Sequence, residues 1–124
     1  MANQNQTGVR RIWNATLYSL SGIKAAYRNE AAFRQEFWLC VFLIPLAFWV
    51  GGNATQRVLL IASCLLVLIV EILNSAIEAT VDRIGEERNK LSGRAKDMGS
   101  AAVFISLGIT LTCWLLIGLE RLGF

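Results

Sequence analysis

Three long apolar segments dominate the pattern of hydrophobic and polar positions along the chain. Their uncharged stretches are residues 37–52, 58–70 and 98–119. A helix needs about 20 residues to cross the roughly 30 Å hydrocarbon layer of a bilayer. Lengthened to that size, the segments predict transmembrane helices at about residues 31–52, 56–84 and 93–120. We expect Pro45 to kink the first of these helices rather than end it, because helices in bilayers tolerate proline.

The segment before the first span is amphipathic. Its apolar residues recur at three- and four-residue steps, and basic and polar residues occupy most of the other positions. The apolar face comprises Val9, Ile12, Trp13, Leu17, Leu20, Ile23 and Tyr27. This spacing predicts a helix at about residues 8–28 that lies along the cytoplasmic surface of the bilayer. Packing against a soluble partner would produce the same pattern.

Composition supports a membrane protein of one domain, residues 1–124. The chain is 55% hydrophobic and 17% charged, whereas soluble domains are typically about 45–50% apolar and about 25% charged. The absence of histidine excludes histidine zinc sites and Ser-His-Asp triads. The three cysteines, each alone in an apolar run, make no disulfide framework or metal cluster. The predicted fold class is therefore an all-α membrane protein with three transmembrane helices and an amphipathic surface helix.

The distribution of basic residues predicts the orientation. Of the 12 Lys and Arg residues, all but Arg57 and Arg121 lie before the first span or around the 79–97 loop. Because Lys and Arg are enriched on the cytoplasmic side, the N-terminus is expected in the cytoplasm and the C-terminus in the periplasm. The net charge of +3 follows from basic residues beside the apolar spans. It therefore favours contact with a membrane surface over binding to nucleic acid.

A polar stripe interrupts the second span. Its members fall at i, i+3, i+4, i+7 and i+11, so on a helix they lie within about 60° of one azimuth. They are Glu71, Asn74, Ser75, Glu78 and Asp82. Placing an ionisable group inside a spanning helix costs free energy, and such groups commonly have a function. For Glu78 and Asp82 a second interpretation stays open, in which they mark the helix end and pair with Arg83 or loop lysines.

The segment around the start of the third span, residues 91–100, adds Arg94, Lys96 and small residues at the same membrane face. These cations could neutralise phosphate oxygens. They could equally be anchors of the kind that the positive-inside rule describes. The sequence has no Gly-rich phosphate loop and no protein-kinase signature, so any phosphate site uses a different scaffold.

Three motifs carry a resemblance to a known family. They are Glu30-Ala-Ala-Phe-Arg-Gln-Glu36, Glu71-Ile-Leu-Asn-Ser-Ala-Ile-Glu78 with Val81-Asp-Arg-Ile-Gly85, and Leu91-Ser-Gly-Arg-Ala-Lys-Asp-Met-Gly-Ser-Ala-Ala-Val103. In this order they closely resemble the small prokaryotic integral-membrane diacylglycerol kinases. The resemblance implies a homotrimer in the bacterial inner membrane that uses ATP and Mg²⁺ to convert diacylglycerol to phosphatidic acid. Residues 50–53 and 86–90 depart from the family pattern.

The resemblance also implies roles for individual residues. Glu71 is expected as the general base with Asn74 beside it, and Glu30 and Glu78 as the carboxylates for Mg²⁺ and ATP. Further contacts to the nucleotide are expected from Arg11, Tyr18, Glu87, Lys96 and Asp97. The lipid site is expected to include Arg11, Ser19, Lys24, Arg34, Trp49, Arg57, Glu71, Ser100 and Trp114.

The chemistry of these residues fits that implication. A carboxylate near hydrocarbon could accept the proton of a lipid hydroxyl, and Mg²⁺ commonly binds one or two carboxylates plus phosphates. Three helices cannot surround such a site, so neighbouring subunits are expected to complete it.

One alternative function is an undecaprenol (polyprenol) kinase of the same fold. Another is a small non-enzymatic membrane protein such as a transporter subunit, since small residues in the third span allow close helix packing.

Overall fold

The computed structural model describes residues 7–85 and 89–124, and within them every regular element is an α-helix. The helices are α1 (Val9–Asn29), α2 (Ala31–Val50), α3 (Ala54–Ile84) and α4 (Lys90–Arg121). The last three are long and apolar enough to cross a membrane. An all-helical chain with three candidate spans, as the hydropathy pattern predicts, is therefore confirmed.

Side chains set several of the helix ends. Asn53 caps α3 by accepting a hydrogen bond from the backbone N–H of Gln56, and Asn89 caps α4 by accepting from Leu91 and Ser92. Such caps satisfy N–H groups that have no partner within the helix. The α2 helix continues through Pro45 to Val50, so the proline does not end it, as expected.

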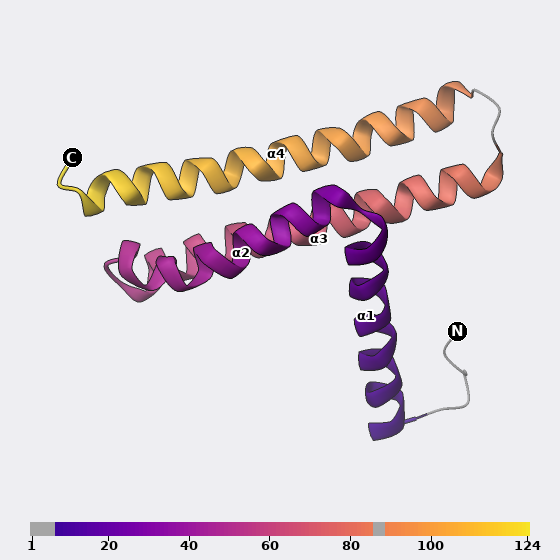
Figure 1. Cartoon of the computed structure of the whole chain (residues 1–124), viewed down its shortest axis with the longest axis horizontal. Helices are drawn as coiled ribbons and strands as arrows, with labels where there is room; N and C mark the ends of the chain where they lie inside the picture. The colour runs from indigo at the N-terminus through magenta and orange to yellow at the C-terminus, as the bar shows by residue number, and fades with distance from the viewer. Residues whose placement is uncertain (1–6, 86–88) are drawn as a thin grey trace.

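The α3 and α4 helices run antiparallel along most of their lengths (Figure 1). Side-chain contacts between them define one register, in which the residue number rises on one helix as it falls on the other. From one end of the pair to the other, the contacts join Gln56 to Glu120, Ser63 to Thr110, Asn74 to Gly99 and Asp82 to Lys96. This register brings the end of α3 that carries the polar stripe beside the start of α4.

The α3 helix is central because the two most extensive helix–helix contacts, with α4 and with α2, are both its own. Figure 1 shows α2 lying along α3 and α1 leaving the start of α2 at a steep angle to the other helices. A small core cluster joins α2, α3 and α4 near the C-terminal end of α2. It contains Ala47, Val50, Leu60 and Ile117, with Ile61 and Trp114 packed against it. Many large apolar side chains outside this cluster are exposed, as lipid or a second protein chain would require.

The lengths of the helices place the polar stripe. The α2 helix has 20 residues and α3 has 31, which correspond to about 30 Å and 46 Å at 1.5 Å per residue. Since Gly51–Asn53 alone joins them, the two helices are level at that end. The α3 helix therefore extends well beyond the start of α2 at the other end, and residues 74–84 form that extension.

Candidate active site

The polar stripe of α3 passes from a buried to an exposed position. Glu71 is buried with 6% of its surface exposed, Asn74, Ser75 and Glu78 are half-buried, and Asp82 is exposed. All of them lie toward the end of α3 that extends past α2. The stripe therefore joins the interior of the helix bundle to its surface at one end.

Three further carboxylates lie close enough to Glu71 to interact with its charge. They are Glu36 on α2, Glu30 at the α1–α2 junction and Glu78 on α3 itself. The packing of α2 on α3 explains this convergence. The Sγ of Cys40 donates a 3.6 Å hydrogen bond to the carbonyl oxygen of Cys64, so these residues are level. Because the helices are antiparallel, Glu30, ten residues before Cys40, is then level with Asn74, ten residues after Cys64.

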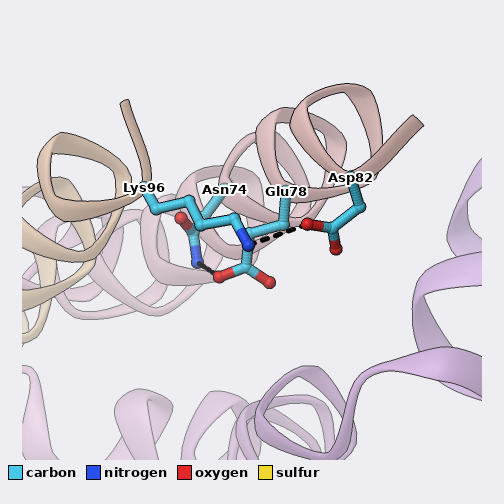
Figure 2. Close-up of polar contacts among 4 residues, drawn as sticks. All are labelled: Asn74, Glu78, Asp82 and Lys96. Atoms are coloured by element: carbon cyan, nitrogen blue, oxygen red, sulfur yellow. Dashed lines mark hydrogen bonds and ion pairs between the residues drawn. The ribbon is translucent and has the colours of Figure 1, made fainter. Parts of the chain in front are cut away.

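Asn74 and Glu78 interact directly. The Nδ2 of Asn74 donates a 3.5 Å hydrogen bond to Oε1 of Glu78, four residues along the helix (Figure 2). The side-chain Oδ1 of Asn74 is buried and accepts no hydrogen bond from the described residues. The amide is thus placed between a carboxylate on its own helix and the surface of α4.

The second contact in this region is an ion pair between the helices. Nζ of Lys96 on α4 lies 2.7 Å from Oδ1 of Asp82 on α3, and Figure 2 shows the lysine reaching across Glu78 to meet it. The charge of Glu78 also acts on Lys96. Asp82 thus pairs with a lysine near the loop, as the second interpretation expects, and this lysine is Lys96.

The donor set can be compared with what a divalent cation requires. Within residues 7–85 and 89–124, no group of three or more Asp, Glu, Cys or His side chains is close enough to hold a metal ion. Mg²⁺ does not need such a group, because it usually retains waters and substrate phosphates beside one or two carboxylates. Glu30, level with Asn74 through the register of α2 on α3, and Glu78, hydrogen-bonded to Asn74, carry hard oxygen atoms of the kind that such an ion binds.

Most of the remaining predicted residues lie on exposed surfaces. On α1 these are Arg11, Tyr18, Ser19 and Lys24, and on α4 they are Asp97 and Ser100. Arg34 is half-buried, and its Nη1 donates to the carbonyl oxygens of Tyr27 and Arg28 at 2.8 and 3.0 Å. It thus satisfies the C-terminal carbonyl groups of α1. Glu87 lies outside the described residues.

Three residues expected at the lipid site lie away from the stripe. The Nε of Arg57 donates to the carbonyl oxygens of Phe48 and Gly51, both at 3.2 Å, and the side chain thereby closes the α2–α3 turn. Trp49 stacks under the guanidinium of Arg121, whose carbon is 5.0 Å from the ring centre. Trp114 packs on the core cluster at this end. Arg57 is 14 residues, or about 21 Å of helix, from Glu71, so one chain does not bring these side chains to the stripe.

Glu36 is a half-buried carboxylate to which the sequence analysis assigns no role. It lines a cavity of about 310 Å³ between α2, α3 and α4, together with apolar residues and with Cys40, Cys64 and Trp114. The signal available in the sequence was a charge within the lengthened first span, six residues after Glu30. It was overlooked because the uncharged stretch begins at Phe37, so that Glu36 resembles a boundary residue.

Comparison with known proteins identifies the relatives of this chain. A family model described as prokaryotic diacylglycerol kinase matches residues 17–118. The diacylglycerol kinase of Pseudomonas aeruginosa is 59% identical over 111 residues, which cover 90% of each chain. The diacylglycerol kinase of Escherichia coli strain K12 is 56% identical over 123 residues, which are 99% of this chain and 100% of the relative. That of Helicobacter pylori strain 26695 is 41% identical over 107 residues, 86% of this chain and 84% of the relative.

Proposed function

The chain belongs to the prokaryotic diacylglycerol kinase family, and on that premise we propose that it transfers the γ-phosphoryl group of ATP to the hydroxyl of diacylglycerol. The product is phosphatidic acid. The observation that carries the proposal is the placement of Glu71, a buried carboxylate at the inner end of a polar stripe. An ionisable group inside an apolar helix is costly, and this cost is usually associated with function.

Glu71 acts as the general base. The lipid hydroxyl loses its proton to the Glu71 carboxylate as its oxygen bonds to the γ-phosphorus, and the bond from that phosphorus to the β-phosphate oxygen breaks. ADP then leaves with the bond electrons. A base must lie within hydrogen-bond reach of the proton it takes, and a buried position beside hydrocarbon is where a lipid hydroxyl can arrive. Asn74, one turn along the stripe, orients the groups around Glu71.

Glu30 and Glu78 would hold Mg²⁺ with the nucleotide, and the ion would neutralise charge on the phosphates. Lys96 supplies a second positive charge toward the phosphoryl group, and the ion pair with Asp82 keeps it at the stripe. Arg11, Tyr18, Glu87 and Asp97 are the further residues that we assign to the nucleotide.

The lipid site includes Ser19, Lys24, Arg34, Trp49, Arg57, Ser100 and Trp114. Within one chain these residues lie far from one another. We therefore propose that neighbouring subunits of a homotrimer bring some of them together. The exposed apolar side chains along α2 and α4 are compatible with such contacts. Diacylglycerol is favoured over a polyprenol because the relatives at 54–59% identity are named diacylglycerol kinases. The same relationship argues against a non-enzymatic transporter subunit.

The enzyme is proposed to reside in the bacterial inner membrane with its N-terminus in the cytoplasm and its C-terminus in the periplasm. This orientation exposes the stripe to cytoplasmic ATP. The α1 helix leaves α2 at the depth of Glu30 and at a steep angle to the spans (Figure 1). With its apolar side chains exposed, it is suited to lie in the bilayer interface.

A phosphorylation assay tests the proposal. Purified protein in mixed micelles, given ATP labelled in the γ-phosphate and Mg²⁺, should label added diacylglycerol. An equal amount of undecaprenol in the same micelles should remain largely unlabelled. Glu71→Gln should abolish the labelling, whereas Glu120→Gln, a matched change on an exposed carboxylate at the other end of the bundle, should not. Full activity of Glu71→Gln would refute the base assignment, and preferential labelling of undecaprenol would assign the enzyme to polyprenols.

A further inference from the structure

Gly99 on α4 lies against the side chain of Asn74 on α3. A β-carbon built on Gly99 would collide with Oδ1 of Asn74 and would lie 3.2 Å from its Cγ. Gly99 is buried, and Oδ1 of Asn74 is itself buried without a hydrogen-bond donor among the described residues. The amide of Asn74 thus occupies the volume that any side chain at position 99 would need.

From this contact we infer that Gly99 is a positioning residue for the phosphoryl-transfer site. Its lack of a side chain allows the Asn74 amide to lie against α4 with Nδ2 directed at Glu78, 3.5 Å away. The inference deepens the proposed function and rests on it, since Asn74 and Glu78 matter for turnover only if this stripe is the active site. Gly99 touches no reacting atom and acts through Asn74.

A comparison with other glycines of α4 supports a specific role. At Gly93 and Gly108, a β-carbon would meet no atom of the described residues within 4 Å. Glycine weakens a helix relative to alanine, and at those two positions the contacts within one chain give no reason for it. At Gly99 the reason is the Asn74 side chain. The close approach of two helix backbones does not account for it alone, because the colliding atoms belong to the amide.

An added methyl group leaves Asn74 few alternatives. The methyl would also lie 3.8 Å from Cα of Asn74, so the amide must rotate away from α4 or the helices must separate. Either movement takes Nδ2 away from Glu78. Misplacement of a positioning group by about 1 Å can lower turnover about 100-fold. Gly99→Ala should therefore lower kcat rather than raise KM.

The kinetic experiment compares Gly99→Ala with Gly108→Ala in mixed micelles that contain diacylglycerol and MgATP. We expect kcat of Gly99→Ala to fall about tenfold or more, with both KM values within about threefold of the wild type. Gly108→Ala should retain wild-type constants. A Gly99→Ala enzyme with kcat within about twofold of the wild type would overturn the inference. Absence of lipid-dependent turnover in the wild type would refute the proposed function instead.

A stability measurement tests the contact without relying on activity. Each variant is heated in detergent, and the protein that remains in the folded elution peak is measured. Gly99→Ala should lower the temperature of half-loss in the wild-type background but not in the Asn74→Ala background, where the methyl fills the vacated space. If Gly99→Ala does not fold, the double variant must restore the folded peak. Equal losses in both backgrounds would show that Gly99 serves helix packing alone and would overturn the inference.

Discussion

Lys96 at the start of α4 forms a 2.7 Å ion pair with Asp82 near the end of α3. The Asp82 side chain is largely exposed and that of Lys96 partly so, and ion pairs in such positions contribute little to stability. The more important effect of the ion pair is that it fixes the position of the Lys96 side chain. The pair holds a flexible ammonium group next to the stripe, where the charge of Glu78 also acts on it.

Removal of Lys96 should be far more harmful than removal of its partner. Lys96→Met eliminates the charge that we propose faces the transferred phosphoryl group, so we expect kcat/KM for MgATP to fall about 100-fold. Asp82→Asn removes only an exposed orienting partner, and the loss should stay below about tenfold. Steady-state kinetics over a range of ATP concentrations measures both. Equal losses in the two variants would contradict this assignment, because Asp82 would then have a role beyond holding Lys96.

The two proposed Mg²⁺ ligands, Glu30 and Glu78, should determine the Mg²⁺ requirement. Glu30→Gln and Glu78→Gln each remove a hard oxygen ligand, so the Mg²⁺ concentration for half-maximal activity should rise about tenfold or more. The measurement is a Mg²⁺ titration at fixed free ATP, with Glu120→Gln as the control at the opposite end of the chain. If kcat falls in Glu78→Gln while the Mg²⁺ dependence is unchanged, Glu78 does not bind the ion.

The sequence was informative where a regular pattern meets a strong physical constraint. Hydropathy predicted three spans because the bilayer thickness fixes helix length. Helical periodicity placed Glu71 and Glu78 on one face because α3 is long and uninterrupted. These are properties of single helices, and packing between helices changes them little.

Contacts between side chains on different helices could not be predicted from the sequence pattern. The convergence of Glu36 on Glu71 arises from the register of α2 on α3, which no local pattern encodes. The contact of Gly99 with Asn74 likewise requires the register of α4 on α3. Arg34 and Arg57 were assigned to the lipid site by resemblance, and within one chain both donate to backbone carbonyl groups at helix ends.

Arg34 should hold α1 to α2. Arg34→Ala removes the hydrogen bonds that a charged group donates to the carbonyl oxygens of Tyr27 and Arg28, and such bonds are stronger than neutral ones. We expect trypsin to cleave after Lys24 and Arg28 about three- to tenfold faster in the detergent-solubilised variant, since local opening controls proteolysis. The readout is mass spectrometry of timed samples. Arg10→Ala, at the other end of α1, is the control, and an equal acceleration there would contradict the proposed link.

The orientation of the spans makes a prediction about access from each side of the membrane. The described structure places the C-terminus and the α2–α3 turn at one end and the stripe at the other (Figure 1). The positive-inside rule assigns the stripe to the cytoplasm, where ATP is available. The side chains at Ile84 and Phe124 are 79% and 89% exposed, so a cysteine at either position should react with a soluble reagent.

Cysteine labelling decides the orientation. In a background with Cys40, Cys64 and Cys113 replaced by alanine, Phe124→Cys should react with a membrane-impermeant maleimide in spheroplasts. Ile84→Cys should react only after the inner membrane is opened, because its end of α3 faces the cytoplasm. The cysteine-free background controls for other targets, and labelling in detergent shows that both sites are reactive. The reverse pattern would place the carboxylate stripe in the periplasm, away from ATP, and would thereby contradict both the orientation and the phosphoryl donor.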